Sequence, residues 1–158
     1  MKYLDKKIVQ SDPLNRDYRD TTTRLIGIAE KEIIMVVGEI GAYKFLDVRW
    51  SLEEAISRGV RVSIYAFSPR SDIRNRLIEL GAKLYLGSEE PRQKYLVVDG
   101  KHWYIAKPEE QEKRAGEAHF DDPKGASLLA KKFQEYIRDK EPVDKIDWED
   151  PLLQLTQD

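Results

Sequence analysis

Segments with the hydrophobic pattern of strands alternate with segments that have the pattern of helices along the first half of the chain. Residues 33–37 form the continuous apolar run Ile-Ile-Met-Val-Val, which is typical of a strand buried on both faces of a sheet. Residues 60–67 alternate branched apolar side chains with more polar ones, and residues 83–86 form another short strand pattern. Between these runs, apolar residues repeat at helical spacing over 45–58 and 72–80. This order predicts an α/β sheet in which helices connect neighbouring strands.

Two longer helices are predicted on either side of this region. The segment from Leu14 to Lys31 has apolar positions at helical spacing, with Asp12 as its cap and Pro13 in its first turn. A second helix is predicted to run from Pro123 to Lys140, because its apolar residues form one stripe. Both helices therefore have a face that must pack against the sheet.

These elements predict one domain over residues 14–140. An arm of residues 1–13 precedes it and contains either a short strand or a flexible segment. The charged run 107–114 predicts a mobile loop, and residues 118–120 predict a last short strand. A polar tail with scattered apolar residues follows over 141–158 and either packs back onto the domain or binds a partner.

A strand, a tight turn and a return strand are predicted in the middle of the domain. Residues 95–98 form a short apolar strand that stops at Asp99-Gly100, a dipeptide that favours the positive φ angles of a hairpin turn. Residues 101–106 form the return strand. Because alternate side chains of a strand share a face, Arg92 and Lys94 are expected to point to the same side of the sheet.

The spacing of this hairpin resembles the motif of the phospholipase D superfamily: His, any residue, Lys, four residues, Asp, usually followed by Gly. Lys94, Asp99 and Gly100 match that motif, and Arg92 stands at the position of the His. In that family the His is the nucleophile that takes the phosphoryl group, the Lys binds phosphate oxygens and the Asp supports the His. A guanidinium stays protonated at physiological pH, so Arg92 cannot attack phosphorus, although its N–H donors can bind a phosphate or carboxylate. The resemblance therefore implies the fold with a degenerate motif, that of a pseudoenzyme.

The resemblance covers residues 14–137, where the order of helices and strands is similar to one half of a phospholipase D-type domain. The segments 57–62 and 80–84 resemble the family at the corresponding helix ends. The implied fold is a mixed β-sheet flanked by helices on both faces. The family's active site joins two motif copies, so the single copy here implies a homodimer with C2 symmetry. Non-catalytic versions of the fold also resemble the effector-sensing region of archaeal sugar-responsive transcription regulators.

Further departures from the family pattern surround the motif. The family usually places Gly-Ser, one residue and Asn after the second hairpin strand, whereas Lys107-Pro108-Glu109-Glu110 occupies that place here. Glu117 corresponds to an acidic residue that family members place before the final strand and helix. His119 lies near a predicted strand, and both residues are candidates for the cleft.

Each candidate of the site has a structural alternative. Lys94 either contacts an anion at the mouth of a dimer cleft or is an ordinary lysine at a strand end. Arg92 either binds a phosphate or carboxylate, or forms an ion pair with an acidic neighbour. The acidic neighbours considered are Glu89, Glu90 and Asp99. Asp99 and Gly100 are interpreted as structural residues, because an Asp-Gly turn needs no ligand.

Composition narrows the classes of partner. The 158 residues include 27 basic and 29 acidic side chains, which gives a net charge of −2 and argues against nucleic-acid binding by bulk charge. The dense mixture of both signs is compatible with a thermophilic or archaeal source. With no cysteine and two histidines, no metal site and no cofactor are expected. No apolar run reaches the length of a signal peptide or membrane span, so we expect a cytoplasmic protein without a membrane partner.

Three hypotheses about function follow. The first is a non-catalytic, homodimeric binding or regulatory module whose anion-binding cleft contains Arg92 and Lys94 and takes a phosphate-containing ligand or a nucleic-acid backbone. The second is a phosphodiesterase or nuclease with an atypical nucleophile. The third is a protein-interaction subunit that contacts a protein partner through its tail, residues 144–158.

Overall fold

The computed structural model describes residues 6–67, 69, 71–108 and 113–143. Within these residues, strands and helices alternate in the first half of the chain, and four strands then follow one another before the last helix. The elements are β1 (Lys6–Val9), α1 (Arg16–Gly27), β2 (Glu32–Val37), the 3-10 helix η2 (Gly41–Lys44), α2 (Leu46–Ser57), β3 (Arg61–Ala66), α3 (Ser71–Leu80), β4 (Lys83–Leu86), β5 (Tyr95–Val98), β6 (His102–Ala106), β7 (Gly116–His119) and α4 (Pro123–Tyr136). The strand-helix-strand order predicted for the first half of the chain is confirmed, and η2 is an addition that the sequence did not indicate.

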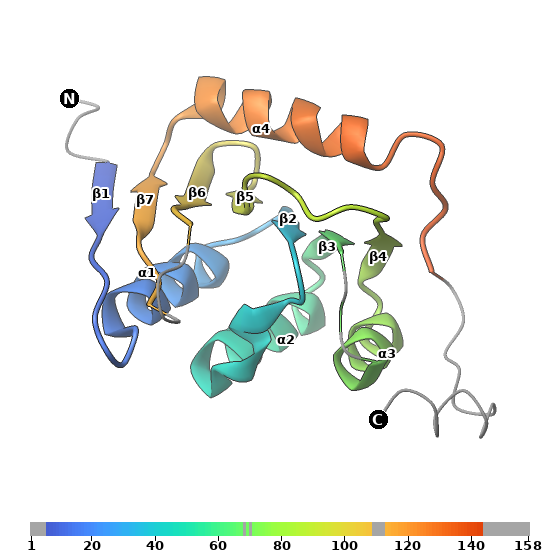
Figure 1. Ribbon diagram of the computed structural model, residues 1–158, viewed down its shortest axis with the longest axis horizontal. Coiled ribbons are helices and arrows are strands. Elements are labelled where there is room, and N and C mark those ends of the chain that lie inside the picture. Colours follow the sequence, from blue (N-terminus) through green and yellow to red (C-terminus); the bar gives the residue numbers. More distant parts are fainter. Residues whose placement is uncertain (1–5, 68, 70, 109–112, 144–158) are drawn as a thin grey trace.

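The described strands form one mixed sheet in the order β1-β7-β6-β5-β2-β3-β4. β2, β3 and β4 are parallel, whereas β5 pairs antiparallel with β2 and the remaining pairs are also antiparallel. Helix α4 crosses one face of the sheet, and α1, α2 and α3 cover the other (Figure 1). The predicted fold class, a mixed sheet with helices on both faces, is confirmed.

The continuous apolar run of β2 is explained by its central position. Ile33 and Met35 pack into the larger core, on the side of α1, α2 and α3. Ile34 and Val36 pack into a second core under α4, together with Leu129 and other apolar residues of that helix. Since successive side chains of a strand point to opposite faces, a strand covered on both faces must be apolar at every position.

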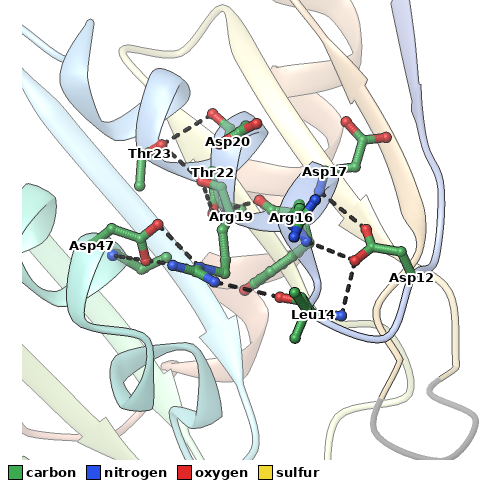
Figure 2. A network of polar contacts seen from close by, with 11 residues as sticks. Asp12, Leu14, Arg16, Asp17, Arg19, Asp20, Thr22, Thr23 and Asp47 are labelled. Carbon is green, nitrogen blue, oxygen red and sulfur yellow. Dashed lines mark hydrogen bonds and ion pairs between the residues drawn. The ribbon is translucent and has the colours of Figure 1, made fainter.

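The first helix is shorter than predicted. α1 begins at Arg16, because Asn15 takes a left-handed backbone conformation with φ 53°. Asp12 nevertheless supplies the predicted cap: its carboxylate accepts hydrogen bonds from the backbone N–H groups of Leu14 at 3.0 Å and Arg16 at 3.1 Å (Figure 2). Pro13 therefore lies in the turn before the helix and not in its first turn.

Figure 2 also shows how α1 is fixed to α2. The Nε of Arg19 donates to both carboxylate oxygens of Asp47, at 3.2 and 3.1 Å. Within α1, the hydroxyls of Thr22 and Thr23 donate to backbone carbonyls one turn earlier, at 2.8 and 2.7 Å. Threonine is therefore accommodated in this helix, because its hydroxyl is satisfied by the helix itself.

The N-terminal segment takes part in the sheet. Residues 6–9 form β1, which pairs antiparallel with β7 and makes one edge of the sheet. Of the two alternatives for the arm, the described residues adopt the short strand. No helix within the described residues has both the length and the apolar character needed to cross a membrane.

The hairpin between β5 and β6 is confirmed, and its turn has the predicted chemistry. Asp99 and Gly100 have φ values of 54° and 68°, the positive values that the two central residues of a primed turn require, and residues 99–101 separate the paired Val98 and His102. Lys101 N–H closes the turn by donating to the carbonyl of Val98 at 3.1 Å. β5 runs over Tyr95–Val98, as its apolar residues predicted, but Arg92 and Gln93 lie in a bend before it, so the strand alternation expected to put Arg92 and Lys94 on one side of the sheet does not reach Arg92.

Asp99 also anchors the turn that precedes β2. Its two carboxylate oxygens accept hydrogen bonds from the backbone N–H groups of Glu30, Lys31 and Glu32, at 2.9, 2.8 and 2.9 Å. Partial burial raises the pKa of the Asp99 carboxyl, and the three N–H donors outweigh this effect, so the pKa lies below its usual value. The charged carboxylate therefore stabilises the contact between the hairpin and the central strand.

We expect the substitution Asp99→Asn to lower the free energy of unfolding at neutral pH by about 1–3 kcal/mol, the usual range for hydrogen bonds to a charged group. The folded pKa is depressed, so this stabilisation is present above the unfolded pKa and is lost as the pH falls through the folded one. Denaturant unfolding of both proteins should therefore show a difference in stability that shrinks as the solution is acidified below about pH 4.

The matched control is Asp139→Asn, because Asp139 is exposed and shares the positive φ, 62°, that asparagine tolerates. The control should change the free energy of unfolding by less than about 0.5 kcal/mol. Equal losses for the two variants would contradict the anchoring role of Asp99.

Candidate functional site

Arg92 and Lys94, the first part of the hairpin motif, lie at the edge of the sheet where the parallel strands end. β2, β3 and β4 run in the same direction, and their carboxyl ends meet at this edge. Because β5 is antiparallel to β2, Arg92 and Lys94 precede β5 at the same edge. In open α/β sheets, ligands bind in the crevice outside the carboxyl ends of the strands, which makes this edge a candidate binding site.

Lys94 lies against the end of β2. Its Nζ is 3.4 Å from Oε1 of Glu90, and the ammonium is partly exposed. A Cβ atom added at Gly38 would lie 3.4 Å from the same Nζ, so the glycine leaves room for the lysine beside the strand end. Lys94 is therefore at once an accessible cation and a partner of Glu90.

Arg92 has different surroundings from Lys94. The strand alternation that would put both side chains on one side of the sheet begins only at Tyr95, and Arg92 lies in the preceding bend with an exposed side chain. Within the described residues, the guanidinium forms no ion pair with Glu89, Glu90 or Asp99, which were the alternatives to ligand binding. The side chain of Arg92 instead lines a hollow that Lys94 does not line.

This hollow, which we call the α4 hollow, has a volume of about 710 Å³ and lies between α4 and the carboxyl edge of the sheet. Its lining includes three cationic and two anionic side chains from two parts of the chain. The lining residues are Tyr65, Ser88, Glu89, Arg92, Gln93, Tyr95, Lys132, Glu135, Tyr136 and Lys140. The charged side chains of the α4 hollow sum to one positive charge, since three cations face two carboxylates.

Tyrosine side chains form the buried part of the α4 hollow. The Tyr65 hydroxyl donates to the carbonyl of Glu89 at 3.1 Å, and the Tyr95 hydroxyl donates to the carbonyl of Leu129 at 3.0 Å. The rings of Tyr65 and Tyr136 are 4.6 Å apart between centroids. Burial raises the pKa of both Tyr65 and Tyr95, so these phenols stay neutral and continue to donate hydrogen bonds to the backbone carbonyls.

Asp99 and Gly100 lie at the opposite end of the hairpin from Arg92. The Asp99 carboxylate bonds the turn before β2, as described above, and not the side chain of Arg92. His102, at the same end of the hairpin, accepts a hydrogen bond at Nδ1 from the backbone N–H of Asp121 at 2.8 Å. Asp99, Gly100 and His102 therefore stabilise the backbone conformation around the hairpin turn, at the end of the hairpin away from the carboxyl edge.

Glu117 and His119 form a separate cluster on the α4 face of the sheet. His119 Nε2 lies 2.7 Å from Oε1 of Glu117, and this hydrogen bond lowers the pKa of the Glu117 carboxyl. The ring of His119 stacks on Trp103 at 3.9 Å between centroids. β6 separates β7 from β5, so this cluster is about 10 Å from the backbone of β5, given a spacing of about 4.8 Å between strands. Neither residue lines the α4 hollow.

The residues that complete the α4 hollow were not found by sequence reasoning. Lys132 and Lys140 come from α4 and the segment after it, about 40 residues beyond Arg92 in the chain. Lys132 Nζ donates to Oε1 of Gln93 at 3.2 Å, which fixes the helix against the bend that contains Arg92. No local spacing signals such a pairing, because the sheet and the helix bring the two segments together only in the folded chain.

The remaining expectations concern a metal site, the tail and the predicted mobile loop. Across the described residues, no group of three or more His, Cys, Asp or Glu side chains lies close enough to hold a metal ion. The tail proposed to bind a protein partner, residues 144–158, lies outside the described residues, as do residues 109–112 of the predicted mobile loop.

We expect Gly87→Ala to destabilise the protein and distort the α4 hollow. A Cβ atom at Gly87 would overlap the hydroxyl and ring of Tyr65, which is buried and cannot move freely. Overpacking of this kind costs about 1–3 kcal/mol, which denaturant unfolding would measure. The control Gly27→Ala adds its Cβ in open space at the end of α1 and should leave stability unchanged or slightly raised. A stable Gly87→Ala variant would show that Tyr65 is not held in place.

Comparisons with known proteins identify the fold. No family model and no curated protein sequence matches this chain. Among solved structures, it is similar to Nuc from Salmonella typhimurium, a phospholipase D family member, with a TM-score of 0.73 and 19% identity over 89% of this chain and 98% of that one. NucT from Helicobacter pylori superposes with a TM-score of 0.70 and 14% identity over 87% of this chain and 98% of that one.

A third similar structure is that of TrmBL2, an archaeal chromatin protein whose structure shows a mode of DNA binding. Its TM-score is 0.68 and its identity 17%, over 88% of this chain and 54% of that chain, so the present chain corresponds to about half of TrmBL2. The similarity to Nuc and NucT extends over almost their whole length. The chain therefore has the fold of a phospholipase D-like domain, as the resemblance of its hairpin motif implied.

Proposed function

We propose that this phospholipase D-like chain is a non-catalytic binding or regulatory module that recognises a phosphate-containing ligand through Arg92 and Lys94. The observation that carries the proposal is the presence of two cations, and no histidine, on the carboxyl edge of the sheet in a fold otherwise like that of Nuc. A guanidinium and an ammonium bind phosphate oxygens well, and neither an arginine nor a paired lysine supplies the nucleophile of the family.

The surroundings of the two histidines support the absence of catalysis. His119 is bonded to Glu117 and stacked on Trp103, in a cluster away from the carboxyl edge. His102 accepts a hydrogen bond from the backbone at the opposite end of the hairpin. Neither imidazole is near Arg92 or Lys94, so neither takes the place of the missing nucleophile.

A homodimer is part of this proposal. The chain contains one copy of the motif, and a twofold axis beside the carboxyl edge would bring two copies of Arg92 and Lys94 to one cleft. Four cations around one cleft would provide a strong local field for a phosphate group or a nucleic-acid backbone in spite of the net charge of −2. The DNA binding of TrmBL2 makes a nucleic-acid backbone a ligand worth testing.

The double substitution Arg92→Ala, Lys94→Ala should weaken phosphate binding by about tenfold or more, because each hydrogen bond to a charged group contributes about 1.5–3 kcal/mol. Isothermal titration with inorganic phosphate and fluorescence anisotropy with a labelled DNA oligonucleotide would measure this. The matched control is Arg61→Ala, Lys83→Ala, which removes the same two charge types from exposed positions at the opposite edge of the sheet. Equal affinities in both variants would argue against a site at the carboxyl edge.

The wild-type chain is expected to show no turnover of a chromogenic phosphodiester or of single- and double-stranded DNA. The reason is that Arg92 remains protonated and no described histidine lies at the edge. Turnover by the wild-type chain that the substitution Lys94→Ala abolished would contradict the proposal and favour an enzyme with an atypical nucleophile.

A further inference from the structure

The α4 hollow combines three cations that share one feature. Arg92, Lys132 and Lys140 form no ion pair with a carboxylate of the described residues. Lys94, at the same edge of the sheet, is instead paired with Glu90 at 3.4 Å. Three cations against the two carboxylates of Glu89 and Glu135 leave the α4 hollow with a net positive charge that a ligand can neutralise.

The cations converge because the fold fixes the two segments that carry them. Arg92 lies in the bend before β5, and the hydrogen bond from Lys132 to the neighbouring Gln93 holds α4 beside this bend. Lys140 lies beyond the end of α4, where its backbone N–H donates to the carbonyl of Ile137 at 3.0 Å. Lys132 is thus held by a helix whose apolar face is buried against the sheet, and Lys140 lies in the segment that follows this helix.

The rest of the α4 hollow is larger and more varied than a bare anion needs. Binding pockets for small molecules have volumes of about 300–1,000 Å³, and the α4 hollow falls in that range at about 710 Å³. Glu89, Glu135, Gln93 and Ser88 supply hydrogen-bond acceptors, which suit the hydroxyl groups of a ligand. The buried tyrosine rings supply apolar surface on the inner side.

We propose that the α4 hollow binds a small hydroxylated organic phosphate, whose phosphate group contacts Arg92, Lys132 and Lys140 and whose hydroxyls face Glu89, Glu135 and Gln93. This inference rests on one part of the proposed function, that the chain binds a phosphate group through Arg92, and it names Lys132 and Lys140 in place of Lys94 as the other cations that contact the phosphate. Arg92 then contacts the ligand from the bend before β5. Lys132 contacts it from α4, and Lys140 contacts it from the segment after α4.

Titration calorimetry with glucose 6-phosphate, glucose and inorganic phosphate tests the ligand class. Glucose 6-phosphate should bind more tightly than inorganic phosphate, and glucose should show no binding, because the phosphate group provides most of the attraction and the hydroxyls add to it. Equal affinities for glucose 6-phosphate and inorganic phosphate would overturn the assignment of an organic phosphate.

Variants test the location. The double substitution Lys132→Gln, Lys140→Gln should weaken binding of glucose 6-phosphate by about tenfold or more. The control Lys124→Gln, Lys131→Gln removes the same charge from exposed positions of α4 outside the hollow and should leave the affinity unchanged. Thermal unfolding of each variant checks that the fold is retained, and glutamine keeps much of the length of the lysine side chain.

Lys94→Ala separates this inference from the proposed function. The α4 hollow is supported as the site if the double substitution Lys132→Gln, Lys140→Gln weakens binding of glucose 6-phosphate and Lys94→Ala leaves it intact. The opposite result would overturn the inference and leave the proposed function in place. In that case Lys94→Ala weakens binding, and the double substitution Lys132→Gln, Lys140→Gln does not. An absence of binding to inorganic phosphate, glucose 6-phosphate and DNA would overturn both.

Discussion

Burial of the central strand β2 on both faces is the constraint on which the rest of the structure depends. Its apolar side chains alternate between a core under α1, α2 and α3 and a core under α4, so both layers of helices are fixed by one strand. β3 pairs with it in parallel and β5 pairs with it antiparallel. The carboxyl edge, where Arg92 and Lys94 lie, is therefore defined by the position of β2.

The hairpin is tied to the same strand at its other end. Asp99 accepts three backbone hydrogen bonds from the turn that leads into β2, so the matching Asp of the motif has a structural explanation that needs no histidine beside it. An Asp and a Gly at this turn are therefore explained by the fold, whatever residue stands at position 92. The register of β5 against β2 then holds the residues before β5 at the carboxyl edge.

Helix α4 both covers the second core and borders a hollow. Its apolar side buries Ala126, Leu129 and Phe133 against the sheet, and Lys132 on its solvent side contacts Gln93. The same packing that excludes water from the core thus holds a lysine beside Arg92. Because the cations of the α4 hollow come from the bend before β5 and from the end of the chain's last described helix, the site exists only when that helix is docked.

The sequence by itself determined the fold class, the order of most elements, the hairpin turn at Asp99-Gly100 and the likeness to the phospholipase D superfamily. These features depend on the periodicity of hydrophobic residues and on the spacing of motif residues, both of which can be seen in the sequence without knowledge of tertiary contacts. The tertiary structure alone decided that Arg92 leaves the strand and lines the α4 hollow, that Lys94 pairs with Glu90, and that Glu117 and His119 form a separate cluster. The physical reason differs between these contacts. Arg92 meets Lys132 and Lys140 only after α4 has packed on the sheet, because the two segments are far apart in sequence. The local pairs Lys94–Glu90 and His119–Glu117 depend on the backbone conformation that the segment before β5 and strand β7 take in the folded sheet.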